Sequence, residues 1–321
     1  MLRGGIVEQM SGRVMPVSVQ MIGNLRITRG NTVLTAEKLG GPKPRQVLEI
    51  LLLNVGSPMS KDRLVDMLWG GRAPGEALAT LESYVSILRR NLQPGCAKSG
   101  PLRTANGGYM IDREMVDVDL YRFQRLLRAA EFAAPANAYP LLNDALSLAS
   151  GPLLGDELTP EWAEEARAAH AEMVQHAQLL AAESALTLGR ADEAVLWAQR
   201  CIAAAPLNEA AWTALIVGLE QSDRHADGLQ AYERCRRIFS DELGCCPGPG
   251  LQEVYGRLLH ATAESSLSEV LGALMVLNER LAPSANRTST AHRKASVPLE
   301  SHYAAAGDIV KTFLTKALMA G

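Results

Sequence analysis

The chain has 321 residues, of which 47% are hydrophobic, 21% charged and 5% aromatic, a composition typical of a globular protein with room for two domains. No apolar run approaches the roughly 20 residues of a membrane span, so we expect no membrane association. Residues 1–15 lack the apolar stretch of a signal peptide, which predicts a cytoplasmic protein.

The net charge of −3 conceals a difference between the two parts of the chain. Residues 17–118 hold 13 Lys and Arg against 9 Asp and Glu, whereas residues 119–283 hold 12 against 23. A basic region favours a polyanionic partner and an acidic region is repelled by one. We therefore expect only the N-terminal domain to contact nucleic acid.

Catalytic and metal-binding motifs are missing from the sequence. It contains no GxxxxGK[ST], HExxH or GxSxG, and no GxGxxG after a strand, so we expect no enzyme and no cofactor. The cysteines are odd in number and form no CxxC pair, which favours reduced thiols. The five cysteines are Cys96, Cys201, Cys235, Cys245 and Cys246. The alternative is a metal site formed by Cys235, Cys245, Cys246 and His225.

Residues 17–117 are predicted to form one domain that begins with a small antiparallel sheet. Apolar and polar residues alternate at its start, and Gly and Asn residues mark the turns. The pattern predicts strands within Val17–Ile27 and over Thr32–Leu34, a buried helix over Arg45–Val55, and a second helix that Ser60 caps and that ends at Trp69.

A third helix carries the expected function. Its apolar stripe, spaced by three and four residues, is Leu78, Leu81, Val85, Leu88 and Leu92. The opposite face is predicted to present Ala79, Ser83, Ser86, Ile87 and Arg90, with Glu82 and Arg89 at its border. Small polar residues with an arginine suit the DNA major groove, about 12 Å wide. A solvated amphipathic helix is the alternative for this segment alone.

Two short extended runs follow the third helix. Leu102–Ala105 and the segment ending Tyr109-Met110-Ile111 flank a Gly-Gly turn at Gly107-Gly108, and they predict a hairpin. A sheet, three helices and a hairpin in this order are the elements of a winged helix-turn-helix, in which the hairpin is the wing.

The N-terminal part resembles the Streptomyces antibiotic regulatory proteins (SARPs). The resemblance rests on Pro44-Arg45-Gln46-Val47-Leu48, Leu51-Leu52-Leu53, Leu64-Val65-Asp66-Met67-Leu68-Trp69-Gly70, Tyr84-Val85-Ser86-Ile87-Leu88-Arg89-Arg90 and Gly108-Tyr109. It implies an OmpR-type winged helix that binds short direct repeats in double-stranded DNA near the −35 region, with copies side by side. It also implies activation of antibiotic gene clusters, and hence a location at the nucleoid.

The candidate DNA-binding residues lie on the second and third helices and near the wing. Arg90 is predicted to enter the groove beside Ser83 and Ser86, and Arg89 to contact phosphate. Family members usually have a basic residue in place of Ile87, so we expect Ile87 either to touch a thymine methyl or to lower phosphate affinity. Arg103 and Tyr109 are candidates for minor-groove or backbone contact, and Lys61 and Arg63 for phosphate contact. The alternative for each charge is ordinary solvation.

Residues 119–283 are predicted to be almost entirely helical. The expected breaks are Pro135, Pro140, Gly151-Pro152, Pro160, Gly189, Pro206 and Gly244–Gly250. Gly189–Val195 aligns with Asp223–Leu229, so that Arg190 and Arg224 are 34 residues apart, the tetratricopeptide (TPR) period. We expect each to begin the second helix of a pair. The alternative is a helical bundle with coincidental spacing.

This half also resembles the SARPs, in what is known as their bacterial transcriptional activation domain. The matching runs are Pro206-Leu207-Asn208-Glu209, Ala231-Tyr232, Asp241-Glu242-Leu243-Gly244 and Pro247-Gly248-Pro249. Cys245-Cys246 and Leu148-Ala149-Ser150-Gly151 depart from the family pattern. The resemblance implies a dimer on DNA and contact with RNA polymerase and its housekeeping sigma factor.

The predicted fold is therefore mainly α with a small β component: an OmpR-type winged helix-turn-helix followed by an all-α TPR-like domain. Residues 1–16 are expected to be a flexible extension and residues 284–321 a linker. Ala304–Ala320 has the pattern of an amphipathic helix, with packing on the domain, binding to a partner and disorder all left open. A protein-interaction scaffold whose winged helix binds no DNA, or a repressor, remains an alternative function.

Overall fold

A computed structural model describes residues 17–95, 100–157 and 160–281. The chain divides into two compact units, Met1–Leu188 and Gly189–Gly321, and each is described by itself. The expected extension before residue 17 and the helix predicted over 304–320 lie outside the described residues. Among the described helices, none is both long enough and apolar enough to cross a membrane.

The first sheet of the winged helix has four strands in the order β3-β2-β1-β7. The predicted strands are observed as β1 (Val17–Gln20), β2 (Arg26–Arg29) and β3 (Thr32–Thr35), which pair antiparallel. The fourth strand, β7 (Val116–Val118), pairs parallel with β1 and was not predicted. Three residues are too few for an alternating pattern to be recognised, and the partner strand is about a hundred residues away.

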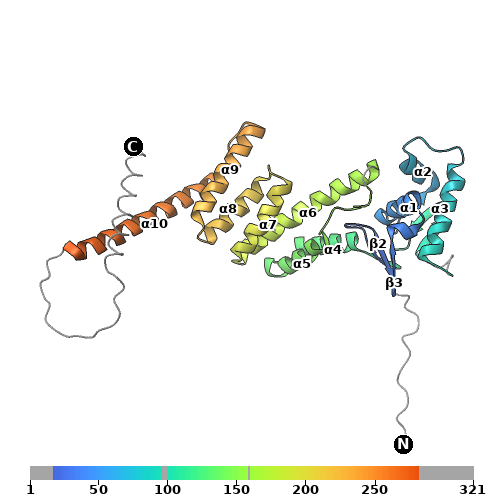
Figure 1. The fold of residues 1–321 in the computed structure, drawn as a ribbon, viewed down its shortest axis with the longest axis horizontal. Helices are drawn as coiled ribbons and strands as arrows, with labels where there is room; N and C mark the ends of the chain where they lie inside the picture. The colour runs from blue at the N-terminus through green and yellow to red at the C-terminus, as the bar shows by residue number, and fades with distance from the viewer. Residues whose placement is uncertain (1–16, 96–99, 158–159, 282–321) are drawn as a thin grey trace, which may run out of the picture. The chain divides into compact units, whose positions relative to one another are not determined.

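Three α-helices follow β3 after a 3-10 turn, η1 (Ala36–Leu39), and Figure 1 shows them gathered beside the sheet. They are α1 (Pro42–Leu53), α2 (Lys61–Trp69) and α3 (Ala77–Leu92). The first begins three residues before the predicted Arg45, because proline at the first helical position needs no hydrogen-bond acceptor. The cap at Ser60 is confirmed, since its Oγ accepts from the Arg63 N–H at 3.3 Å.

The apolar stripe of α3 is confirmed except at its first residue. Leu81, Val85, Leu88 and Leu92 are buried, but Leu78 is 48% exposed and Ala77 is buried in its place. The expectation for Leu78 was therefore wrong. A helical projection leaves the first turn ambiguous, and packing there selects the smaller residue.

The wing is the hairpin β5 (Leu102–Ala105) and β6 (Gly108–Ile111), joined by β4 (Met59–Ser60) in the order β4-β6-β5. Its turn is Asn106-Gly107, with φ of 51° and 75°, and not the predicted Gly107-Gly108. Gly108 is needed for a different reason: a Cβ there would lie 1.9 Å from the carbonyl oxygen of Met59. The close approach lets β4 pair with β6.

Three helices of the second half belong to the same compact unit as the winged helix (Figure 1). They are α4 (Asp119–Glu131), α5 (Pro135–Leu148) and α6 (Glu161–Thr187). The predicted break at Pro140 is wrong, since this exposed proline lies inside α5. A proline removes one backbone donor from the helix, and α5 continues past it by packing against α4 and α6.

Buried hydrogen bonds join the winged helix to these helices. The two Asp119 carboxylate oxygens accept from the backbone N–H groups of Met21 and Ile22 at 2.8 and 3.0 Å. Further along, the Glu157 carboxylate accepts from Arg45 Nε and Gln46 Nε2, both at 2.7 Å. These contacts cross between the two predicted halves of the chain, which explains why the compact unit extends to Leu188.

Glu49 is the most unusual member of this junction. It lies on α1, is fully buried, and its nearest cation is Arg45, whose Nε is 3.8 Å from Glu49 Oε1. Burial, reinforced by the charge of Glu157, raises the pKa of Glu49 to about 9. A carboxyl group with this pKa is protonated at neutral pH, and neither Glu49 oxygen has a hydrogen-bond partner among the described residues.

The second unit is all helical in its described part and confirms the TPR-like pattern (Figure 1). Its helices are α7 (Ala191–Ala204), α8 (Glu209–Gln221), α9 (His225–Leu243) and α10 (Pro249–Leu281). Helices α7 and α9 begin 34 residues apart, directly after Arg190 and Arg224 as expected. Trp212 anchors the packing: it is fully buried and its Nε1 donates to the Pro206 carbonyl at 2.8 Å.

Candidate nucleic-acid interface

The outward face of α3 is small and polar. Ala79, Ser83, Ser86 and Arg90 are all exposed. The Ser83 and Ser86 hydroxyls donate to the carbonyls of Ala79 and Glu82 at 3.0 and 2.9 Å. Each serine Oγ therefore keeps lone pairs that can accept from a base or a bridging water. Small side chains allow the helix backbone to approach a base edge, and Arg90 supplies a positive charge at the end of this face.

Ile87 lies at the edge of this face and is partly covered. It packs over Gly40 in the turn before α1, where a Cβ would be only 2.4 Å from Ile87 Cγ2. Gly40 also has a φ of 97°, a conformation that favours glycine. The apolar side chain therefore has a packing role that the sequence did not reveal. Its expected contact with a thymine methyl stays a prediction.

Arg89 fastens the wing to α3. Its Nη2 donates to Thr104 Oγ1 at 2.7 Å and its Nε to the Leu102 carbonyl at 3.3 Å, both on β5. Its guanidinium also lies 5.7 Å from the Tyr109 ring centroid. Thr104 was missed at the sequence level, because nothing in a two-strand hairpin pattern indicates which side chain meets the helix. Arg89, which is predicted to contact phosphate, thus also connects α3 to the wing.

Tyr109 is buried, with only 4% of its surface exposed. The expectation that it touches the minor groove or the DNA backbone does not fit this position. Its ring instead supports two cations, Arg89 and Lys61, the latter with Nζ 5.8 Å from the ring centroid. Aromatic residues are common both in wings and in cores, and the sequence pattern cannot separate the two.

Lys61 is paired with Glu82 on the neighbouring helix. The Lys61 Nζ lies 2.5 Å from Glu82 Oε1, and this hydrogen bond raises the pKa of the lysine ammonium. The pair places a carboxylate at the border of the outward face of α3. Lys61 therefore contributes less net positive charge to the surface than an unpaired lysine would.

The remaining two candidates lie on β5 and α2. Arg103 on β5 pairs with Asp112 at 2.8 Å and is 45% exposed. Arg63 is exposed on α2, and its side chain lines a pocket together with residues of α1 and α6, including Gln46 and Trp162. The structure thus brings Lys61 and Arg89 to the Tyr109 ring, with Arg89 on the same helix as the exposed Ser83, Ser86 and Arg90. The contacts given for Arg63 and Arg103 are with other residues.

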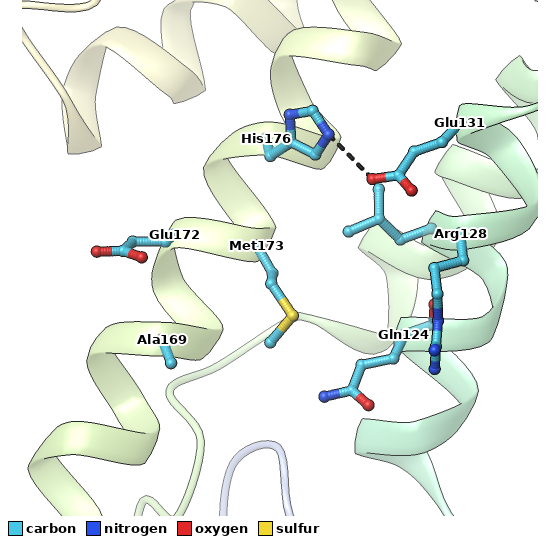
Figure 2. A pocket seen from close by; sticks show the side chains of 8 residues that line it. Gln124, Arg128, Glu131, Ala169, Glu172, Met173 and His176 are labelled. Atoms are coloured by element: carbon cyan, nitrogen blue, oxygen red, sulfur yellow. Dashed lines mark hydrogen bonds and ion pairs between the residues drawn. The ribbon is translucent and has the colours of Figure 1, made fainter.

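A groove lies between α4 and α6 in the same unit, and Figure 2 shows Met173 pointing into it. At one end His176 Nε2 is 3.1 Å from Glu131 Oε1. The groove is lined by Gln124, Leu127, Arg128, Glu131, Ala169, Glu172, Met173 and His176. These lining residues mix apolar groups with both charges and include no hydroxyl or thiol nucleophile. Within the described ranges, no group of three His, Cys, Asp or Glu is placed to hold a metal ion.

Comparison with known families assigns the two halves of the chain. The family described as "Transcriptional regulatory protein, C terminal" matches residues 37–111, and "Bacterial transcriptional activator domain" matches residues 118–259. Regulatory protein DnrI of Streptomyces peucetius is 30% identical over 258 residues, which cover 76% of this chain and 93% of DnrI. The chain belongs to the SARP family of transcriptional regulators.

Other SARP-type relatives agree with this assignment. Regulatory protein AfsR of Streptomyces coelicolor is 36% identical over 79% of the chain, although the match spans only 25% of AfsR. Transcriptional regulatory protein EmbR of Mycobacterium tuberculosis is 32% identical, over 81% of the chain and 69% of EmbR. The solved structure of M. tuberculosis EmbR in complex with a low affinity phosphopeptide aligns with a TM-score of 0.68 at 31% identity, covering 82% of this chain and 71% of that one.

The family assignment fits the geometry of α3 and the wing. The exposed α3 face and the wing belong to the segment that matches the transcriptional-regulator family, residues 37–111. The activator-domain match begins at residue 118, at the end of β7. The compact unit that ends at Leu188 therefore contains the winged helix and the first helices of the activator domain.

Proposed function

We propose that this SARP-type regulator activates a secondary-metabolite gene cluster of the antibiotic kind. In this proposal two copies bind side by side on direct repeats near the −35 region and contact RNA polymerase and its housekeeping sigma factor. The relatives with the names AfsR, DnrI and EmbR are regulatory proteins, which supports regulation over catalysis for this chain.

The observation that carries the DNA-binding part is the exposed face of α3. Ser83, Ser86 and Arg90 point outward from a helix whose other side is buried, and Arg89 holds the wing beside it. A recognition helix needs a rigid support and an uncluttered outer face to reach base edges. Both are present on this helix.

The test is a footprinting and gel-shift experiment with the full chain on promoter fragments from its own genomic neighbourhood. We expect protection of tandem repeats and a steep loss of affinity between two salt concentrations, because phosphate contacts release counterions. Arg90→Ala should lose about 1–3 kcal/mol of binding free energy. Arg125→Ala, which removes an exposed arginine from α4, is the matched control and should bind like wild type.

Two outcomes would contradict the proposal in different ways. Absence of binding above competitor DNA, even at low salt, would indicate that the winged helix serves protein contacts. Binding followed by reduced transcript in an assay with purified RNA polymerase would indicate a repressor. An increased transcript that depends on the repeats would support activation.

A further inference from the structure

Glu82 is an unexpected residue for a DNA-facing surface. Its side chain is 55% exposed, and it lies at the border of the outward face of α3, one turn from Ala79 and Ser86. A carboxylate brought near a duplex is repelled by the phosphates. Its presence beside the outward face therefore calls for a compensating contact, either within the protein or with DNA.

One of the two carboxylate oxygens of Glu82 has a partner within the protein. Glu82 Oε1 accepts from Lys61 Nζ at 2.5 Å, whereas Oε2 has no hydrogen-bond partner among the described residues. Lys61 is itself placed by the buried Tyr109 ring, 5.8 Å from its Nζ. The three residues come from α2, α3 and β6, so three separate elements hold one carboxylate in one position and leave one of its oxygens available.

The chemistry of the free oxygen limits what it can bind. An ionised carboxylate accepts hydrogen bonds and donates none. In the major groove only the N4 amine of cytosine and the N6 amine of adenine donate. The adenine amine is flanked by the N7 acceptor, which repels a carboxylate, whereas cytosine presents a carbon next to its amine. Cytosine is therefore the base edge that matches Glu82.

We propose that Glu82 reads a cytosine by accepting a hydrogen bond from its N4 amine, and that Lys61 is the positioning residue that orients the carboxylate. This inference rests on the proposed DNA-binding function and names one element of its specificity. It also gives Lys61 a role other than the phosphate contact expected from the sequence.

The test is selection of binding sites from a randomised double-stranded DNA library by full-length wild type and Glu82→Gln in parallel. Glutamine can bond adenine through N6 and N7 together. We expect one position of each half-site to change from cytosine to adenine, with a discrimination on the order of tenfold in each case. Circular dichroism of Glu82→Gln checks that the variant is folded.

Two further variants separate base reading from general electrostatics. Glu76→Gln removes the same charge from the exposed start of α3 and should raise affinity evenly without changing any base preference. Lys61→Ala should broaden the preference at the same position that Glu82→Gln changes. If the Lys61–Glu82 ion pair has only a structural role, its removal would alter stability or overall affinity. The base preference at that position of the DNA site would then stay unchanged.

The selection experiment distinguishes failure of the proposed role of Glu82 from failure of the proposed DNA-binding function. Enrichment by both proteins with identical base preferences would overturn the role of Glu82 and leave DNA binding intact. Enrichment by neither protein would overturn DNA binding itself and this inference with it. A cytosine in the wild-type site that Glu82→Gln replaces by adenine supports the proposal.

Discussion

Replacing Glu49 by glutamine should stabilise the protein at neutral pH. Glu49 is fully buried in α1, and burial followed by the charge of Glu157 raises its pKa to about 9 from an unperturbed 4.5. A glutamine amide has nearly the same shape as the protonated carboxyl and is likewise uncharged. It is neutral in both the folded and the unfolded chain, so folding does not require it to retain a proton.

The magnitude follows from proton linkage. Below pH 4.5 Glu49 is protonated in both states, and the folded protein incurs no penalty. Between pH 4.5 and about 9 the unfolded chain releases the proton and the folded protein retains it, so the free energy of unfolding falls by about 1.4 kcal/mol per pH unit. At pH 7 the accumulated loss is about 3 kcal/mol. Glu49→Gln should regain up to this amount, with little difference from wild type at pH 5.

Urea denaturation of the full chain at pH 5, 6, 7 and 8, followed by circular dichroism and tryptophan fluorescence, measures this difference. Hydrogen exchange at amides of α1 assigns the gain to the unit that contains Glu49. Glu172→Gln removes an exposed carboxylate from α6 and should leave the pH dependence of wild type unchanged. The reasoning would be refuted if the advantage of Glu49→Gln did not grow from pH 5 to pH 8. That result would mean that Glu49 is ionised and paired with Arg45.

Three further substitutions test the scaffold around the recognition helix. Arg89→Ala should cost about 1–2 kcal/mol of stability in denaturant titrations, because Thr104 Oγ1 loses its charged donor, and should weaken DNA binding in a gel shift by loosening the wing. Gly108→Ala forces a Cβ against the Met59 carbonyl and should lower stability by more than about 2 kcal/mol in a thermal melt. An unchanged melting temperature would show that β4 and β6 can move apart at little cost. Glu157→Ala should cost about 3 kcal/mol by removing the nearest carboxylate partner of the half-buried Arg45, and should expose new cleavage sites in limited proteolysis.

Much of the fold was predictable because its determinants are local. The spacing of Leu81, Val85 and Leu88 predicts the buried side of α3, and all three are buried. The 34-residue offset between Arg190 and Arg224 predicts the start of α7 and α9. In both cases the pattern is visible along the sequence itself, so it can be recognised without knowing which elements contact one another.

The candidate surface was less predictable because exposure there depends on contacts between elements. Tyr109 is buried, and its ring lies next to Lys61 and Arg89, which are 48 and 20 residues earlier in the chain. Ile87 is partly covered because a glycine turn approaches it. One sequence feature bears on the missed Lys61–Glu82 pair: the Ser60 cap fixes Lys61 at the first position of α2, the helix directly before α3.

The buried junction has a consequence for how the protein would occupy neighbouring repeats. Asp119 and Glu157 bind backbone and side chains of the winged helix, so α3 and the helices α4 to α6 belong to one compact unit. If two copies bind side by side, the repeat spacing that they accept is then set by the shape of this unit and not by the length of a flexible linker. Loosening the junction with Glu157→Ala should therefore widen the range of repeat spacings that are bound. If Glu157→Ala binds the same narrow range of repeat spacings as wild type, the determinant of spacing lies elsewhere in the chain.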